Sequence, residues 1–306
     1  MAEAVLHIGF NKCGSTAIQT WLEEQRGWLR DKGIFWDRED PRPRFACANP
    51  QFFVLAHTLA RRPVPDLPIF HVLGLHKGDT DTQVRLAHEV LDRVQALATR
   101  DDLRTFVMSS EFFVSPHVTK AIPHHLHGWL QQHFERVRYV AYIRQPLPWL
   151  ISLHGHLVKQ NKMDETLEHF LTTHKAWFRP RLELWRAGLP QGIELDVRLF
   201  EESWLSGDGL LDDFAQLLGL TKAPGTRAAP VNRVYRAPTA GLRQQISAAA
   251  WRLKPRPRVA PDLARLVHDR HADDMAWIAE TFFAGRRDAF RAWAGSPAPD
   301  ERDVAT

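Results

Sequence analysis

The amino-acid sequence predicts an α/β protein in which a mainly parallel β-sheet is flanked by helices. Short apolar runs alternate along the chain with amphipathic segments of helical period. The first run leads into a glycine-bracketed loop and a helix start, and later runs end directly in polar side chains. An added helical segment is expected at the C-terminal end.

The first element is a buried strand that closes with Leu6 and Ile8. Gly9 and Gly14 bracket the tight loop that follows, and Ser15 or Thr16 opens an amphipathic helix. The N–H groups of such a loop converge with those of the first helical turn, and the helix dipole adds positive potential. This stretch therefore predicts an anion cradle, although an ordinary strand-to-helix turn has the same pattern.

The spacing of the two glycines nearly matches the nucleotide-binding P-loop, G-x-x-x-x-G-K-[ST]. Gly9 and Gly14 fit this pattern, but Ser15 stands where the lysine belongs, and Lys12 lies inside the loop instead. Lys12 can still reach a bound phosphate, by a different path from that of an ATPase lysine. We therefore expect a P-loop-type sheet without the usual magnesium arrangement of kinases.

The remaining elements continue the alternation. Four more strands are expected at 34–36, 105–108, 137–143 and 193–199. Helices are expected at 51–59, 83–98, 119–134, 146–160, 165–173, 176–187, 209–218, 240–253, 261–270 and 273–293, and a long loop at 221–238. Ligands of parallel sheets bind at the carboxyl ends of strands, which is where Lys12, Glu111 and Arg144 fall.

A second motif begins at the end of the 137–143 strand. Arg144 follows the strand directly, and its planar guanidinium suits phosphate oxygens. Pro146 is compatible with the first turn of a helix, and Ser152 follows about two turns later, so that its hydroxyl can face the same ligand. A structural arginine at the end of the sheet has the same local pattern.

Together the two motifs resemble those of the sulfotransferases that use 3′-phosphoadenosine 5′-phosphosulfate (PAPS), in particular bacterial and carbohydrate sulfotransferases. In this chain Cys13 replaces the Thr or Ser that is usual in the loop. The resemblance implies PAPS as co-substrate and adenosine 3′,5′-bisphosphate as product. It assigns donor binding to the following residues: Asn11, Lys12, Cys13, Gly14, Ser15, Thr16, Arg144, Ser152 and, on a looser match, Arg236.

The same resemblance suggests how the catalytic roles are divided. Lys12 would neutralise the charge that grows on the donor's bridging oxygen, and Glu111 would take the proton of an acceptor hydroxyl. Alternatively, Glu111 only orients the acceptor or pairs with an arginine. Weaker candidates for the base are His57, His76 and His154. No metal site is expected.

Other aromatic and histidine side chains have simpler explanations. We expect Phe52, Phe53, Phe112, Phe113 and Trp149 to belong to the core rather than to an acceptor platform. His124, His125 and His127 are expected at the surface.

Composition sets limits on partners and location. The 306 residues are 44% hydrophobic and carry a formal net charge of +4, which suits an anionic ligand and lacks the basic tail of a nucleic-acid-binding protein. With only Cys13 and Cys47, no secretion signal and no membrane-length apolar run, a cytoplasmic enzyme is expected. The expected division is a sulfotransferase-like domain at 1–236, a helical extension at 237–296 and a tail at 297–306.

Two alternative functions stay open at this stage. One is a P-loop kinase-like enzyme of the same fold, and the other is a nucleotide-binding protein that does no chemistry. The acceptor is a hydroxyl-bearing glycan, peptide or small metabolite, and the sequence does not distinguish among these. It does not fix the oligomeric state either.

Overall fold

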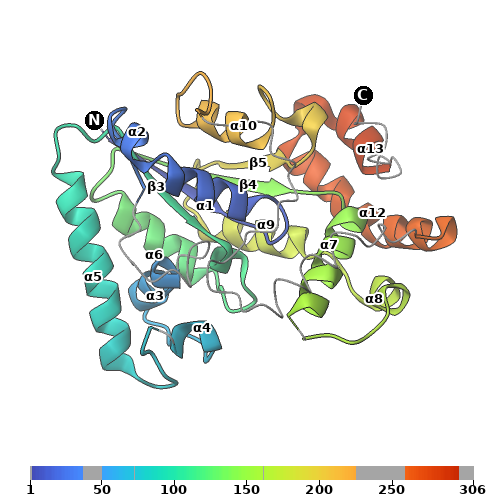
Figure 1. Ribbon diagram of the computed structural model, residues 1–306, viewed down its shortest axis with the longest axis horizontal. Coiled ribbons are helices and arrows are strands. Elements are labelled where there is room, and N and C mark those ends of the chain that lie inside the picture. Colours follow the sequence, from blue (N-terminus) through green and yellow to red (C-terminus); the bar gives the residue numbers. More distant parts are fainter. Residues whose placement is uncertain (1, 37–49, 72, 161, 225–258, 296–306) are drawn as a thin grey trace, which may run out of the picture. The chain divides into compact units, whose positions relative to one another are not determined.

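The computed structural model describes residues 2–36, 50–71, 73–160, 162–224 and 259–295 (Figure 1). The described chain forms two compact units. The sheet unit contains the described residues up to 144 together with 177–224, and the helical unit contains 145–160, 162–176 and 259–295. The division expected from the sequence, at residues 236 and 296, remains a prediction.

The sheet unit is built on five parallel strands in the order β2-β3-β1-β4-β5 (Figure 1). Their bounds are β1 Glu3–Ile8, β2 Ile34–Trp36, β3 Thr105–Ser110, β4 Arg136–Ile143 and β5 Leu195–Leu199. All five strands were predicted. The predicted class, an α/β protein with a parallel sheet, is confirmed.

Helices cover both faces of this sheet because its strands are apolar on both sides. The helices of the sheet unit are α1 Ser15–Glu24, α2 Arg26–Arg30, α3 Pro50–Leu59, α4 Pro68–His71, α5 Thr80–Ala98, α6 Ala121–Leu130, α9 Phe178–Gly188 and α10 Leu210–Leu217. Side chains alternate along β4: Tyr139 contacts α6 and α9, whereas Tyr142 bonds to Asp213 of α10. The sheet is therefore buried between two helical layers.

The strand order places β1 at the point where the chain changes direction. From β1 the chain builds β2 and β3 on one side, and it then crosses to β4 and β5 on the other side. Crevices at the carboxyl ends of strands next to such a switch point are the usual ligand sites of open α/β sheets. The loop after β1 occupies this position, with the ends of β3 and β4 on either side.

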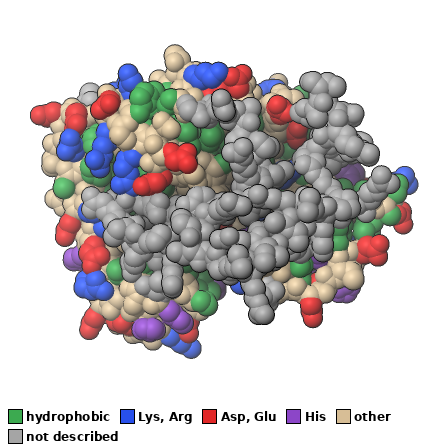
Figure 2. Space-filling model, in the orientation of Figure 1, with side chains coloured by type: hydrophobic (Ala, Val, Ile, Leu, Met, Phe, Trp, Pro, Cys, Tyr) green, Lys and Arg blue, Asp and Glu red, His purple; other side chains and the backbone are tan. Residues whose placement is uncertain are grey.

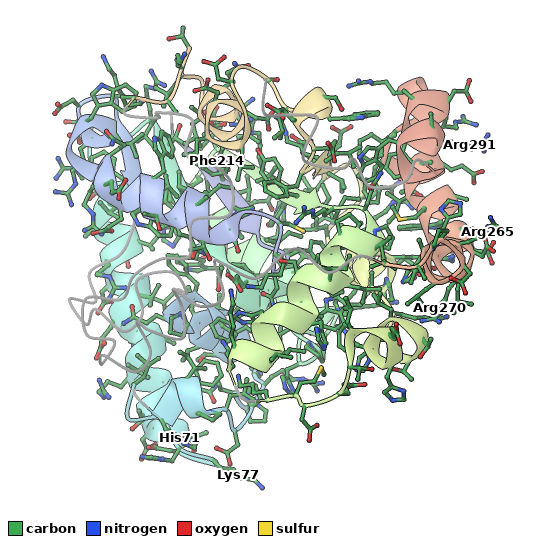
Figure 3. The ribbon with its side chains drawn as sticks, turned by 45° about the vertical axis from the view of Figure 1, so that its right-hand side comes forward. His71, Lys77, Phe214, Arg265, Arg270 and Arg291 are labelled. Atoms are coloured by element: carbon green, nitrogen blue, oxygen red, sulfur yellow. The ribbon has the colours of Figure 1, made fainter. Side chains whose placement is uncertain are left out.

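The helical unit consists of α7 Pro146–Lys159, α8 Leu167–Thr173, α12 Pro261–Phe282 and α13 Arg287–Gly295. Arg270 of α12, labelled in Figure 3, donates to the carbonyl oxygens of Leu171, Thr172 and His174. Its guanidinium therefore satisfies acceptors at the carboxyl end of α8, where the helix itself provides no donors.

The prediction of separate helices at 261–270 and 273–293 is wrong. Helix α12 continues through this point, and the break comes at Phe283 instead. His271 is buried and its Nε2 accepts from the N–H of Ala176, so it continues the inward face that includes Val267 and Met275. The predicted helix at 240–253 lies outside the described residues.

The prediction of a surface position for His127 is also wrong. His124 and His125 are exposed as expected, but the His127 side chain is buried and its Nδ1 lies 2.9 Å from the Tyr139 hydroxyl. Burial lowers the pKa of His127, so the ring is neutral at pH 7. Its position one turn after Pro123 on α6 turns it toward β4.

Charged side chains on the surface are mixed in sign. Figure 2 shows lysine and arginine side chains interspersed with aspartate and glutamate on the face that it presents. This distribution is the one expected of a chain whose formal net charge is only +4.

A substitution at Gly33 tests whether the turn before β2 needs a residue without a side chain. Its φ is +72°, and an added Cβ would lie 2.6 Å from the backbone oxygen of Asp102. Gly33→Ala should therefore lower the free energy of unfolding by about 1–3 kcal/mol, measured by urea denaturation. Gly27 of α2 is the control because a Cβ there meets open space, so that Gly27→Ala should be neutral or stabilising. Equal losses in both variants would contradict this account.

Candidate functional site

The loop between β1 and α1 contains a left-handed backbone position that favours glycine. Gly14 has φ +85°, and a Cβ there would lie 2.3 Å from the Leu210 side chain and 3.1 Å from Phe200. Lys12 also has a positive φ, +63°, which is uncommon for a residue with a side chain. The loop closes with a hydrogen bond from Cys13 N–H to the Phe10 oxygen (3.2 Å).

The N-terminus of α1 lies at the end of this loop. Gly14 is its N-cap residue and provides no side-chain oxygen to the N–H groups of the first turn. Anions bind readily at such helix starts, because the N–H groups and the dipole act together. Asn11 and Lys12 are half-buried here, Thr16 is exposed, and Cys13 is a buried free thiol.

Glu111 lies directly after β3 and beside the loop. The hydroxyl of Ser15 donates to its Oε1 at 2.8 Å, and its Cα lies 3.8 Å from the position of a Cβ on Gly9. Burial raises the pKa of Glu111, while the Ser15 hydrogen bond and the positive charge of Lys12 partly offset that rise. Lys12, Ser15 and Glu111 therefore interact with one another and form one electrostatic group beside the loop.

Arg144 joins this group from the end of β4. Its guanidinium carbon lies 5.7 Å from the centre of the Phe200 ring, the same ring that limits space at Gly14. Its charge also acts on Cys13: burial raises the pKa of the thiol, and Arg144 opposes that rise. The two sequence motifs, about 130 residues apart in the chain, thus meet at one edge of the sheet unit.

Two of the predicted donor-binding residues are not joined to this group by the structure. Ser152 lies on α7 in the helical unit, which is described separately from the sheet unit. Arg236 lies outside the described residues. The roles assigned to both remain predictions.

The structure adds three buried residues that the sequence analysis missed. His7 Nδ1 lies 2.8 Å from the Ser109 hydroxyl, and Gln19 Nε2 donates to the same oxygen at 3.1 Å. Gln19 follows Ser15 by one helical turn, and Ser109 precedes Glu111 by two residues, so α1 is joined to the end of β3 by two parallel side-chain bonds. The two bonds join residues 96 and 90 apart in the chain, so no local sequence signal points to them.

The three residues form the inner part of a polar ladder, His7–Ser109–Gln19, whose outer bond is Ser15–Glu111. All of the inner members are at most 1% exposed. Burial lowers the pKa of His7 to about 3, so its ring is neutral at pH 7. The ladder therefore holds the start of α1 against Glu111 without adding charge to the site.

The weaker base candidates have structural partners elsewhere. His57 is buried, its Nδ1 contacts the Pro63 oxygen at 2.9 Å, and burial lowers its pKa to about 4. His154 belongs to the helical unit, where its Nε2 contacts the Glu165 oxygen. His76 is exposed beside His71. Within the sheet unit, Glu111 is the proposed base that lies beside the loop.

The aromatic residues lie mostly where the sequence analysis favoured them. Phe52, Phe53 and Phe113 are fully buried in the sheet unit, and Trp149 is buried on α7. Phe112 is half-buried and contacts Phe53 with ring centres 5.6 Å apart. These rings belong to the core, as predicted.

Among the described residues, no group of three or more histidine, cysteine, aspartate or glutamate side chains is arranged to hold a metal ion. None of the described helices combines the length and apolar character needed to cross a bilayer.

Comparison with known proteins gives one weak likeness. No family model matches the chain, and no curated protein does. Among solved structures, the chain is similar to a sulfotransferase from Alicyclobacillus acidocaldarius, with a TM-score of 0.47 and 13% sequence identity. The similarity covers 91% of this chain and 95% of that one. A likeness this distant says nothing about activity, so the function has to be argued from the chain's own residues.

Ser15→Ala tests the electrostatics of Glu111. The donated hydrogen bond favours the charged carboxylate, so its loss should raise the pKa of Glu111 further. The measurement is a ¹³C NMR titration of the glutamate carboxyl carbons. Thr16→Ala is the control, because Thr16 is the exposed next residue of the same helix. A lower or unchanged Glu111 pKa in Ser15→Ala would contradict the assignment.

Proposed function

We propose that this chain is a sulfotransferase that moves a sulfuryl group from PAPS to an acceptor hydroxyl. One observation carries the proposal: the lysine-containing loop, Glu111 and Arg144 lie at the same edge of the sheet unit, at its switch point. An anion cradle, an acid–base group and a second cation are the three parts that such a transfer needs.

The loop and Arg144 suit opposite ends of a doubly phosphorylated adenosine. Residues 11–16 would hold the 5′-phosphosulfate through backbone N–H groups and Lys12, a fit supported by the left-handed backbone at Lys12 and Gly14 before the start of α1. Arg144 would hold the 3′-phosphate, with Ser152 and Arg236 as the further contacts that the family resemblance implies.

In the proposed reaction the acceptor oxygen bonds to sulfur while the bond from sulfur to the donor's phosphate oxygen breaks. Lys12 and the first N–H groups of α1 neutralise the charge that develops on that phosphate oxygen. Glu111 receives the acceptor's proton. The burial that raises its pKa makes it a better base, and at neutral pH it must still be ionised to act.

A kinase-like reaction is less well supported. Ser15 occupies the position of the P-loop lysine, and its hydroxyl is already bonded to Glu111. Thr16, which follows in the P-loop pattern, is exposed without a carboxylate partner among the described residues. The acceptor is proposed at the level of its hydroxyl group only.

Lys12→Ala and Arg144→Ala separate the two cationic roles. Lys12→Ala should reduce sulfate transfer by about 10²–10³-fold, because it removes charge stabilisation at the reacting centre. Arg144→Ala should mainly weaken donor binding, by about 10–100-fold in Kd, as expected for a lost charge-assisted phosphate contact. Transfer of labelled sulfate to an acceptor panel and donor titration measure these effects. Lys120→Ala, an exposed lysine, is the control; full turnover in Lys12→Ala would refute the role of this lysine.

Calorimetry distinguishes the proposed donor from that of a kinase. The wild-type chain should bind adenosine 3′,5′-bisphosphate without metal and more tightly than ATP with magnesium, since Arg144 would hold the 3′-phosphate. The reverse preference would support the kinase-like alternative. Bisphosphate binding without transfer to any acceptor would support a binding protein.

A further inference from the structure

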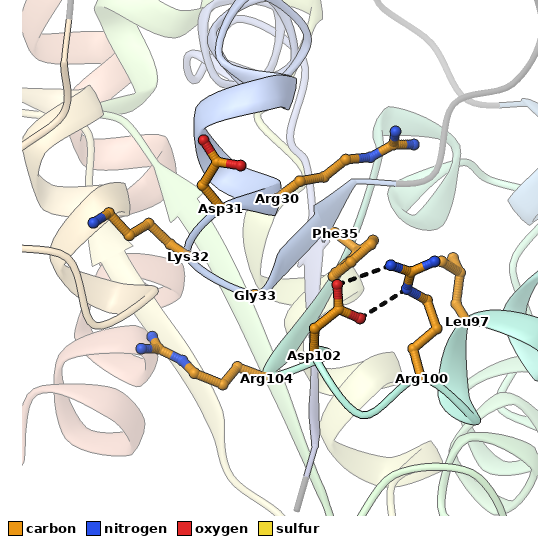
Figure 4. Close-up of a pocket in the computed structure, with 9 residues that line it drawn as sticks. All are labelled: Arg30, Asp31, Lys32, Gly33, Phe35, Leu97, Arg100, Asp102 and Arg104. Atoms are coloured by element: carbon orange, nitrogen blue, oxygen red, sulfur yellow. Dashed lines mark hydrogen bonds and ion pairs between the residues drawn. The ribbon is translucent and has the colours of Figure 1, made fainter.

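A charged cavity lies at the edge of the sheet unit opposite to the loop, Glu111 and Arg144. Its volume is about 730 Å³, and it is lined by residues at the ends of α2 and α5 and at the starts of β2 and β3 (Figure 4). The lining residues are Arg30, Asp31, Lys32, Gly33, Phe35, Leu97, Arg100, Asp102 and Arg104. Because β2 and β3 begin here, the cavity is separate from the loop, Glu111 and Arg144, which lie at the carboxyl ends of the strands.

The charge of this cavity is unbalanced. Four of its side chains are cations and two are carboxylates. Asp102 is already engaged, since Arg100 donates two hydrogen bonds of 2.8 Å to it. Among the described residues, no carboxylate lies within ion-pair distance of Arg30, Lys32 or Arg104. Clefts lined mainly by one sign of charge concentrate ions of the opposite sign.

Parts of the cavity are fixed in place before any ligand binds. Arg100 lies over the Phe35 ring, 5.1 Å from its centre, in addition to its bonds to Asp102. The oxygen of Gly33 accepts hydrogen bonds from Arg104 N–H and Thr105 N–H, so the backbones that carry Lys32 and Arg104 are held side by side. Restraint of this kind lowers the entropic cost of binding.

The cations lie on both sides of a bare stretch of backbone. Figure 4 shows Lys32 and Arg104 extending to one side of Gly33 and Arg30 and Arg100 lying on the other. Gly33 has no side chain, and its φ of +72° and the nearby Asp102 oxygen exclude one. The two groups of cations therefore flank a turn that is closed by backbone atoms of 102–104.

We propose that this cavity binds a compact polyanion that bears at least two phosphate or sulfate groups. One anionic group contacts Lys32 and Arg104, and another contacts Arg30 and Arg100. A single anion would engage only one side, so affinity should depend on the number of anionic groups. The proposed site is distinct from the donor site and does not depend on the proposed reaction.

Isothermal titration calorimetry of the full chain at low ionic strength tests this proposal. Tripolyphosphate and a disaccharide with two sulfate esters present the same chemistry from different sources, and inorganic phosphate is the single-anion comparison. The titrations use Lys12→Ala as the background, to reduce binding at the loop. We expect a polyanion to bind at least tenfold more tightly than inorganic phosphate.

Charge variants identify the site. Lys32→Glu/Arg104→Glu should weaken polyanion binding at least tenfold, and Asp31→Asn should strengthen it, because Asp31 is the lining carboxylate without an arginine partner among the described residues. The single charge reversal Lys120→Glu, at an exposed lysine outside the cavity, should change the affinity less than twofold. Thermal unfolding of each variant checks that the fold is retained.

Three results would overturn the proposal. Unchanged polyanion affinity in the double variant would show that the cations only stabilise the carboxyl ends of α2 and α5 and do not bind the ligand. If Lys120→Glu lost as much polyanion affinity per reversed charge as the double variant, the binding would be non-specific electrostatic attraction. Equal affinity for inorganic phosphate and tripolyphosphate would exclude a two-group ligand. All three results are independent of sulfate transfer.

Discussion

The close packing at Gly14 is the constraint on which the candidate site depends. Leu210 and Phe200 occupy the space that a side chain at position 14 would need, and the left-handed backbone there brings α1 to its start. Phe200 also lies under the guanidinium of Arg144. One aromatic ring therefore sets both the path of the loop and the position of the second cation, so the two motifs are coupled by packing as well as by charge.

Leu210 is in place because buried carboxylates hold α10. The Tyr142 hydroxyl and Arg198 Nη1 donate to the same oxygen of Asp213, at 2.6 and 2.8 Å. The buried Asp212 accepts from two backbone N–H groups, those of Asp208 and Ala223. Buried carboxylates are costly unless they are paired in this way. The geometry of the loop after β1 thus depends on side chains of β4 and β5.

How much of this could be predicted from the sequence depends on the range of the interactions. The strands and the loop could be predicted because alternation and glycine spacing are local signals. That Arg144 and Lys12 share an edge followed from a general property of parallel sheets. The roles of Phe200, Leu210 and the His7–Ser109–Gln19 ladder could not be predicted, because each is defined by a partner distant in sequence. The surface position of His127 and the helix break next to His271 were wrong predictions, because a buried histidine takes the place of an apolar residue in the pattern.

The charges at Glu111 connect donor binding to proton transfer in the proposed reaction. Lys12 lowers the pKa of Glu111 and so opposes the effect of burial. A phosphosulfate held by Lys12 would balance that cation and add negative charge nearby, and both changes raise the pKa of a carboxylate. Glu111 would then be a stronger base with the donor bound than without it. A lysine inside the loop, rather than at the P-loop position that Ser15 occupies, would allow one side chain to act on both the donor and Glu111.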